Sequence, residues 1–227
     1  MNIGVLGTGM VAKTIAAKLA SLGHAVTLGT RDVADTLARD QPDMAGGPPL
    51  RVWLDQHPTA KLGTQAEAAA QGDLVINALS GQGALPGLRS AGAASLAGKI
   101  LIDISNPLDF SAGMPPSLSI ANTDSLGEQI QRALPDTKVV KTLNTVTAPL
   151  MVDPRQLHDG DHSMVMCGND AGAKAEVHRI LTDWLGWKDV IDLGDITTAR
   201  GTEQLLPIWI RLYMSFGHAN YNFKIVR

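Results

Sequence analysis

A glycine-rich turn near the amino terminus most constrains what this chain can fold into. Residues 3–7 ("IGVLG") are typical of a buried strand, and "GTGMVA" follows at once, matching G-x-G-x-x-A at Gly7, Gly9 and Ala12. The next segment, 10–23, has apolar residues at helical spacing and ends at a glycine. A strand, a glycine-rich turn and a helix in this order are typical of a dinucleotide-binding βαβ unit.

Each small residue of this motif has a distinct physical role. We expect Gly7 to make the tight turn, Gly9 to let a pyrophosphate approach the backbone, and Ala12 to let the helix pack closely on the strand. The free N–H groups at the start of the helix would then face the anion. The alternative is a βα turn without a ligand, which the position of the motif between a strand and a helix disfavours.

The end of the second expected strand, residues 25–30, indicates which dinucleotide is bound. Thr30 and Arg31 stand where many dinucleotide enzymes have an acidic residue. An acid would bind the ribose 2′-hydroxyl and repel a 2′-phosphate, whereas a hydroxyl and a planar guanidinium suit a phosphate dianion. The alternative is a surface arginine paired with Asp32 or Asp35. The pattern favours NADP(H).

Strand-like and helical segments alternate along almost the whole chain, with residues 80–87 ("SGQGALPG") expected to form a loop. Later strands are expected over 73–79, 99–105, 138–144, 162–168 and 188–194, and helices over 65–71, 125–134, 170–185 and 198–216. This alternation predicts an α/β fold with a Rossmann-like, doubly wound and mainly parallel sheet. We expect one NADP-binding domain over 1–227, in which 197–227 forms a C-terminal helix and tail.

Residues at the carboxyl ends of the strands are candidates for the rest of the site, because ligands of open α/β sheets lie there. The candidates are Leu79, Ser80, Asn106, Pro107 and the segment from Asn144 to Ala148. The two asparagines could contact the nicotinamide or a second ligand. Equally, each could tie down its own loop through an Asx turn.

Composition excludes several classes of function. The chain has 227 residues, 44% of them hydrophobic and 18% charged, with a net charge of −3. It has no basic block and no long apolar run, so we expect neither a nucleic acid nor a membrane as partner. The one cysteine, Cys167, fits a reducing compartment, and we expect a cytoplasmic protein.

Residues of the usual catalytic types form no recognisable pattern. His158 and His162 are four apart but lie in a loop-like segment without a third ligand, so no metal site is expected. Cys167 lies in an apolar strand and is interpreted as core, and no catalytic residue is identified.

The apolar residues of 203–216 exceed what one helix face usually buries, which predicts a homodimer or additional core. Pro207 should kink this helix or mark its start.

Four longer segments carry a family resemblance. They are "IGVLGTGMVAKTIAAKLASLGHAVTLGTRD", "DISNP", "SLGEQIQRALPDTKVVKTLNTV" and the tail "NFKIVR". Together they resemble the NADPH-dependent oxidoreductases of the deazaflavin coenzyme F420, a domain that also forms the cytosolic part of six-transmembrane ferric reductases. The resemblance covers nearly the whole chain.

This resemblance implies hydride transfer between NADP(H) and a flavin-like acceptor, coenzyme F420 or a flavin. It implies cofactor contacts at the glycine motif, the second strand end and three loops, namely Thr8, Gly9, Met10, Val11, Thr30, Arg31 and the loops after Leu79, Ser105 and Asn144. The archaeal family members have histidine in place of Asn144, which leaves the acceptor open. An imine or carbonyl reductase and a non-catalytic NADP sensor are the alternatives.

The acceptor is expected beside the nicotinamide, past the strands that end near 79, 105 and 144. Its walls would be the loop 80–87, the Asn106-Pro107 turn, the segment 144–149 and the tail 218–225. In the tail, Lys224 or Arg227 could meet acidic groups of the acceptor, or remain solvated.

Overall fold

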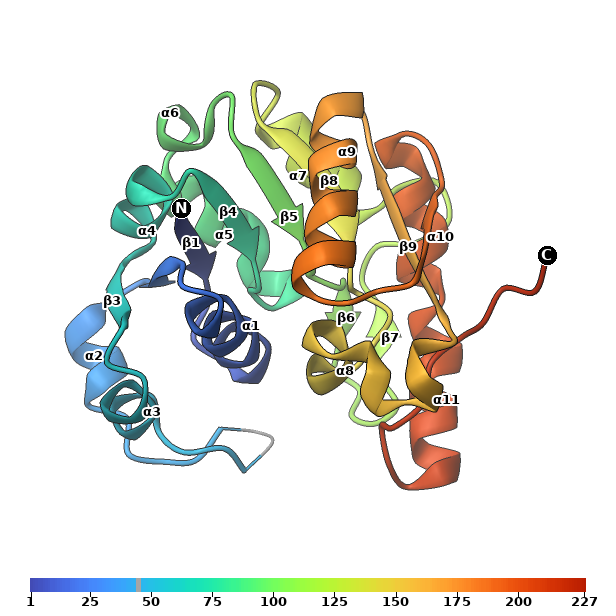
Figure 1. The fold of residues 1–227 in the computed structure, drawn as a ribbon, viewed down its shortest axis with the longest axis horizontal. Coiled ribbons are helices and arrows are strands. Elements are labelled where there is room, and N and C mark those ends of the chain that lie inside the picture. The colour runs from blue at the N-terminus through green and yellow to red at the C-terminus, as the bar shows by residue number, and fades with distance from the viewer. Residues whose placement is uncertain (44–45) are drawn as a thin grey trace.

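The computed structural model describes residues 1–43 and 46–227 and has an eight-stranded sheet at its centre (Figure 1). The strands of this sheet are β1 (Asn2–Leu6), β2 (Ala25–Thr30), β3 (Ala60–Thr64), β4 (Leu74–Asn77), β5 (Ile100–Asp103), β8 (Lys138–Thr142), β9 (Ser163–Gly168) and β10 (Asp189–Asp192). Their order across the sheet is β10-β9-β8-β5-β4-β1-β2-β3. The chain therefore builds outward from β1 to β3, returns to β4 on the other side of β1, and continues to β10.

The pairings of the described strands are parallel in this sheet, except that β9 runs antiparallel to β8. Ile3 of β1 lies opposite Val26 of β2 on one side and Leu74 of β4 on the other. The central strands are continuous apolar runs because helices cover both of their faces. The expected Rossmann-like, doubly wound and mainly parallel α/β fold is confirmed.

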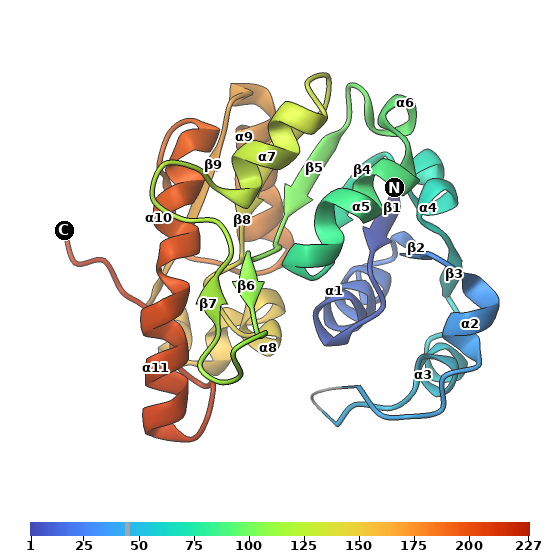
Figure 2. The same ribbon diagram turned by 180° about the vertical axis from the view of Figure 1, so that it is seen from behind.

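Helices lie on both faces of the sheet. They are α1 (Met10–Ser21), α2 (Val33–Leu37), α3 (Leu50–Gln56), α4 (Gln65–Gln71), α5 (Gly81–Ala91), α6 (Ala93–Leu96), α7 (Leu126–Ala133), α8 (Ala148–Val152), α9 (Ala171–Arg179), α10 (Ala199–Gln204) and α11 (Leu206–Phe216). Helices α1 and α9 lie in front of the sheet in Figure 1, and α5 and α7 lie in front of it in Figure 2. Each face has its own buried core.

Helix starts follow from capping side chains that the sequence supplies. Ser125 accepts a hydrogen bond from the backbone of Glu128 and begins α7, as its position predicts. Thr64 and Glu67 form a reciprocal capping box at the start of α4. These local bonds set where the helices begin and so where the preceding strands end.

Residues 80–87 do not form the expected loop; they begin helix α5. Ser80 caps this helix by accepting from the backbone of Gly83 at 3.3 Å, and Ala84, Leu88 and Ala91 bury its apolar face. Tertiary packing therefore overrides the low helix propensity of three glycines and Pro86. The glycines serve packing, because the helix starts directly against the backbone of Asn106.

The C-terminal region differs from the expectation in two ways. The expected helix 198–216 is two helices, α10 and α11, and Pro207 lies in the first turn of α11, which confirms that it marks a start. The tail does not form a wall of the predicted acceptor site. It lies beside β9, where the backbone of Ser163 donates to Phe223 and Lys224 pairs with Asp161.

Arg227, the other tail cation expected near the acceptor, pairs with Asp189 at 2.9 Å. The expected helix 170–185 is confirmed: α9 continues directly into a π-helical segment over Ile180–Trp184. A two-stranded hairpin, β6 (Leu108–Asp109) and β7 (Ser117–Leu118), was not predicted.

None of the described helices has the length and apolarity required to cross a bilayer.

Candidate functional site

The turn between β1 and α1 has the geometry that the glycine motif requires. Gly7 has a φ of +121°, and a Cβ built on it would lie 2.8 Å from the carbonyl oxygen of Ala78. A side chain is therefore excluded on both conformational and steric grounds. A Cβ on Gly9 would meet nothing within 4 Å, so the backbone there faces open space.

That open space is a groove of about 1020 Å³, which we call the Gly-loop groove. Its described lining comprises Gly7, Thr8, Gly9, Met10, Val11, Lys13, Thr36, Arg39, Asp40, Gln41, Pro42, Asp43, Pro48, Pro49, Leu50, Ala78, Leu79 and Ser80. Gly9 is the N-cap of α1 and offers no side-chain acceptor to the first N–H groups of the helix, and the first turn contains no acid. These N–H groups and the helix dipole can therefore bind an anion.

The end of the groove where the ribose is expected differs from the prediction in detail. Thr30 is buried and Arg31 is exposed, and neither belongs to the described lining. Thr36 and Arg39, which the sequence analysis missed, do line the groove. Both were missed because the short helix α2 brings Thr36 beside the end of β2, and Arg39 follows two residues after the end of this helix.

The alternative pairing of Arg31 is not observed. Among the residues that the structure describes, Arg31 forms no ion pair, and Asp32 instead caps α2 by accepting from the backbone of Asp35 at 2.8 Å. Arg31 is therefore available to an anion at the end of β2.

A second space adjoins the groove and has a different character. This apolar cavity has a volume of about 700 Å³. The described residues that line it are Met10, Val11, Ala78, Leu79, Ser80, Gly81, Gln82, Ile104, Ser105, Asn106, Leu108, Phe110, Ser111, Asn144, Val146, Thr147, Ala148, Met151, Leu206 and Trp209. None of these lining residues carries an ionisable side chain. Met10, Val11, Ala78, Leu79 and Ser80 line both spaces, so the groove and the cavity share a wall.

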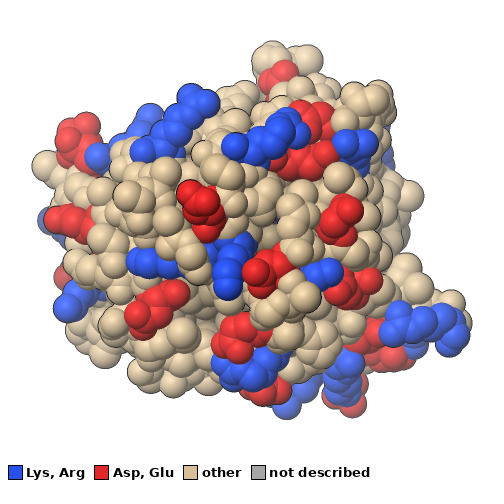
Figure 3. Space-filling view, turned by 90° about the horizontal axis from the view of Figure 1, so that it is seen from above, with Lys and Arg blue, Asp and Glu red and all other residues tan. Residues whose placement is uncertain are grey.

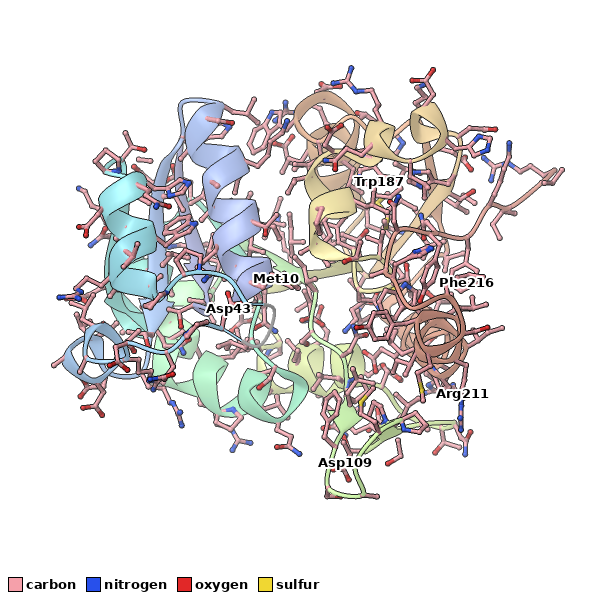
Figure 4. The ribbon with its side chains drawn as sticks, turned by 90° about the horizontal axis from the view of Figure 1, so that it is seen from below. Met10, Asp43, Asp109, Trp187, Arg211 and Phe216 are labelled. Atoms are coloured by element: carbon pink, nitrogen blue, oxygen red, sulfur yellow. The ribbon has the colours of Figure 1, made fainter. Side chains whose placement is uncertain are left out.

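The view onto the carboxyl edge of the sheet shows how these spaces are arranged (Figure 4). Met10 lies between Asp43 on one side and the helix α11, with Arg211 and Phe216, on the other. The opposite, amino edge carries acidic and basic side chains interspersed, without a large patch of one sign (Figure 3).

Asn106 and Asn144 bond to each other across two loops instead of each tying down its own loop. The side-chain amide of Asn106 donates to the backbone carbonyl of Asn144 at 2.8 Å, and that of Asn144 donates to Oδ1 of Asn106 at 3.0 Å. The buried Oδ1 of Asn144 has no hydrogen-bond partner among the described groups. The pair fixes the ends of β5 and β8 relative to each other.

Two walls of the apolar cavity were not predicted. The β6–β7 hairpin supplies Leu108 and Phe110, and the last helices supply Leu206 and Trp209. Pro107, a predicted contact, is buried behind the lining, and its carbonyl accepts from the backbone of Ser119 at 2.8 Å. Pro107 thus anchors the hairpin.

Behind the cavity lies a buried ion cluster that the sequence analysis also missed. Lys141 of β8 pairs with Asp103 and with Glu203 at 2.8 Å each, and all three side chains are at most 1% exposed. Burial lowers the pKa of Lys141, but the two carboxylates outweigh burial and raise this pKa above its ordinary value. Removing one member would leave a buried charge unpaired, at a cost of about 3–5 kcal/mol.

The remaining candidate groups have no catalytic arrangement. Burial raises the pKa of Cys167 to about 11, which keeps its thiol protonated. His162 is buried, with Nε2 at 3.0 Å from the carbonyl of Pro154 and Nδ1 at 2.8 Å from the Asn222 amide. Within residues 1–43 and 46–227, no group of three or more His, Cys, Asp or Glu side chains could hold a metal ion.

The residues present fit a dinucleotide. Gly9 leaves room in front of the helix start where a phosphate would approach, and a side chain there would fill that room. The backbone N–H groups after Gly9 supply donors, and the groove continues into the apolar cavity along a shared wall. A dinucleotide could therefore lie with its phosphates on α1 and one ring in each space.

Comparison with known proteins gives three kinds of match. The model of the family "NADP oxidoreductase coenzyme F420-dependent" matches residues 2–107. A crystal structure from Arthrobacter sp. FB24, of a protein provisionally named an F420-dependent NADP-reductase, is 59% identical over 100% of both chains, with a TM-score of 0.95. The metalloreductase STEAP3 of Rattus norvegicus is 28% identical over 215 residues, which are 92% of this chain and 38% of that protein.

More distant structures share the fold alone. The reductive aminase of Aspergillus terreus, in complex with NADPH and ethyl levulinate, is 20% identical with a TM-score of 0.63. That match covers 96% of this chain and 64% of the aminase.

Proposed function

Because the chain belongs to the coenzyme F420-dependent NADP oxidoreductases, we propose that it transfers a hydride between NADP(H) and a flavin-like acceptor, a deazaflavin or a flavin. The family makes it an NADP-dependent oxidoreductase. The proposal adds the class of acceptor and its position in the apolar cavity.

One observation carries this proposal: a cavity without ionisable lining residues shares a wall with the Gly-loop groove. Hydride transfer requires two rings in contact, about 3–3.5 Å apart at the reacting atoms. A volume of about 700 Å³, lined mainly by aliphatic and aromatic side chains, suits an uncharged flat ring beside the nicotinamide.

The chain's own residues would bind, orient and exclude water. Backbone N–H groups from Gly9 onward would bind the phosphates, and Arg31 with Arg39 would bind a 2′-phosphate. The Asn106–Asn144 pair fixes two loops of the cavity, and the apolar side chains of Met151, Leu206 and Trp209 would help to exclude water from it. When bound, the nicotinamide supplies the hydride, so the protein needs no acid–base pair for the transfer itself.

Reduction of an imine or carbonyl is the second candidate, since the fold is shared with reductive aminases. Such a reaction delivers a proton to nitrogen or oxygen as well as a hydride to carbon. No described residue of the cavity lining has an ionisable side chain that could supply this proton. A flavin-like ring also needs a proton in the end, but it delocalises the negative charge that the hydride brings and can be protonated by water after release. The lining therefore favours the flavin-like acceptor.

An acceptor panel tests the proposal. Purified protein is mixed with NADPH and, in separate reactions, with coenzyme F420, FMN, riboflavin, a cyclic imine and a ketone, while the nicotinamide absorbance is followed. We expect oxidation of NADPH with the deazaflavin or a flavin, and a matching change in the acceptor's own spectrum. Turnover of the imine or ketone without turnover of any flavin-like compound would contradict the proposal.

A further inference from the structure

The cluster formed by Lys141, Asp103 and Glu203 lies directly behind the apolar cavity. Lys141 uses all three ammonium protons, donating to Oδ2 of Asp103 at 2.8 Å, to Oε1 of Glu203 at 2.8 Å and to the carbonyl of Ser105 at 2.5 Å. Ser105 itself lines the cavity. Ser105 therefore connects the ammonium group to the lining of the space proposed for the nicotinamide ring.

Hydrogen bonding identifies both acids as carboxylates. Asp103 accepts from the amide of Asn77 at 2.7 Å and from the hydroxyl and backbone N–H of Ser105. Glu203 accepts from two backbone N–H groups at the start of α7, at 2.8 and 3.0 Å. Every described partner of the two groups donates, which only an ionised carboxyl group satisfies in full.

The cluster therefore carries a net charge. One ammonium and two carboxylates sum to one negative charge, and all three side chains are almost completely buried. Water and salt screen such charges weakly. The described cavity lining has no charge of its own that could offset them.

A nearby negative charge distinguishes the two forms of the cofactor. Loss of a hydride, which is a proton with two electrons, leaves the nicotinamide ring with one positive charge, and the acceptor gains the hydride. We propose that the Lys141–Asp103–Glu203 cluster favours NADP⁺ over NADPH at this site and thereby makes bound NADPH a stronger hydride donor. This inference rests on the proposed function, because it requires the nicotinamide ring to lie in the apolar cavity beside the acceptor.

The test is the ratio of the dissociation constants of NADP⁺ and NADPH, measured by titration calorimetry without any acceptor. Glu203→Gln removes one negative charge from the cluster. We expect it to weaken NADP⁺ binding about fivefold relative to NADPH, or ~1 kcal/mol. An unchanged ratio in a folded Glu203→Gln protein would overturn the inference.

Glu128→Gln is the matched control. Glu128 is also buried, lies in α7 and pairs with Arg200 of α10 at 2.6 Å, so it ties the same two helices and carries the same charge. It is not part of the cluster behind Ser105, and we expect its substitution to leave the ratio unchanged. An equal shift in this control would show a general charge effect and also overturn the inference.

Two further variants separate charge from geometry. The double variant Lys141→Met with Glu203→Gln keeps one net negative charge and is expected to restore the wild-type ratio of dissociation constants. A shift like that of the single variant would contradict the role of net charge.

Should Glu203→Gln not fold, as thermal unfolding would show, Asp103→Asn removes the same charge and carries the same expectation. A wild-type protein that binds both cofactor forms but reduces no flavin-like acceptor would instead refute the proposed function, and the ratio would still decide the inference.

Discussion

The hydroxyl oxygens of Thr30 and Thr36 lie 2.7 Å apart, and Thr36 also donates to the backbone carbonyl of Asp32 at 2.6 Å. This bond holds α2 against the end of β2. It leaves Arg31, one residue further on, exposed and without an ion pair among the described residues. The end of β2, where the ribose is expected, is thus held by two threonines, and Arg31 lies exposed beside it.

Arg31→Ala is expected to remove most of the preference for NADPH over NADH. A charge-assisted hydrogen bond contributes about 1.5–3 kcal/mol, so the lost discrimination should be roughly ten- to a hundredfold. The measurement is the pair of dissociation constants for NADPH and NADH. Arg89→Ala, an exposed arginine at the end of α5, is the control and should change neither constant. Equal affinities in the wild-type protein would refute the assignment.

Arg39→Ala tests the contact that the sequence analysis missed. Arg39 lines the groove beside Thr36, so we expect its loss to weaken NADPH binding while NADH binding stays nearly constant. The double variant with Arg31→Ala separates shared from independent contributions, because two groups on one phosphate are not additive. A loss of affinity for both cofactors alike would place Arg39 away from the 2′-phosphate.

Ala148→Phe is expected to block turnover while NADPH binding is kept. Ala148 is 1% exposed, begins α8 and lines the apolar cavity but not the Gly-loop groove. A phenyl ring there would occupy space proposed for the acceptor. Steady-state kinetics and calorimetry should show at least tenfold lower kcat/KM at similar NADPH affinity, about 1.4 kcal/mol in the barrier. Ala148→Ser is the control of similar size, and full turnover by the phenylalanine variant would place the acceptor elsewhere.

Gly81→Ala should destabilise the fold, although alanine usually stabilises helices. A Cβ at this position would lie 2.0 Å from the carbonyl oxygen of Asn106, and backbone must shift to admit it. We expect a loss of about 1–3 kcal/mol in urea unfolding. Gly201→Ala, in α10 with nothing within 4 Å of the added Cβ, is the matched control and should gain up to ~1 kcal/mol. Equal effects at both positions would contradict the close packing of α5.

We expect a homodimer that covers the exposed face of α11. Ile208, Met214 and Phe216 are 52%, 48% and 52% exposed, which is unusual for large apolar side chains on one helix. Sedimentation at micromolar concentration should give a dimer, and Ile208→Glu combined with Phe216→Glu should give a monomer. Val226→Glu, in the exposed tail, is the control and should stay dimeric. A monomeric wild-type protein would rule out this assembly.

Asp124→Asn tests a pH-dependent contribution to stability. A hydrogen bond from Arg132, aided by Gln129, lowers the pKa of Asp124 to about 2. A pKa lowered by folding stabilises the protein above the unfolded value, and this contribution is lost as the pH falls from about 4 towards 2. The substitution should cost ~1 kcal/mol or less at pH 7, because Arg132 is largely exposed, and almost nothing near pH 2. Asp55→Asn, an exposed residue without an ion pair in the described chain, should show no such trend.

Much of the fold could be predicted because its strands are continuous apolar runs bounded by glycine, proline or capping residues. The start of α7 at Ser125 and that of α11 near Pro207 could be predicted because serine and proline are typical of the first positions of a helix. Residues 80–87 could not be predicted as a helix, since three glycines and a proline normally indicate a loop. Their helix depends on tertiary packing, in which Gly81 lies against the backbone of a loop 25 residues later in the sequence, and no local pattern reveals such a contact.

The candidate site was predicted only where strand ends determine it. Each of the predicted residues Gly7, Gly9, Leu79, Ser80, Asn106, Asn144 and Ala148 lines at least one of the two spaces, as the topology of a parallel sheet requires. Arg39, Phe110 and Trp209 were missed because a short helix, a hairpin and a distant helix bring them there. The ion cluster was missed because Lys141 looks like any strand residue until its two partners are known.

The groove and the cavity at the carboxyl edge of the sheet are lined by different segments of the chain. The described lining of the Gly-loop groove lies wholly within residues 7–80, whereas the apolar cavity also takes residues from Ile104 to Trp209. Mutations after codon 80 can therefore reshape the second space while the first keeps its lining. Selection could in this way change which compound receives the hydride without rebuilding the reductant's binding site, a separation that would let one ancestral chain diversify step by step.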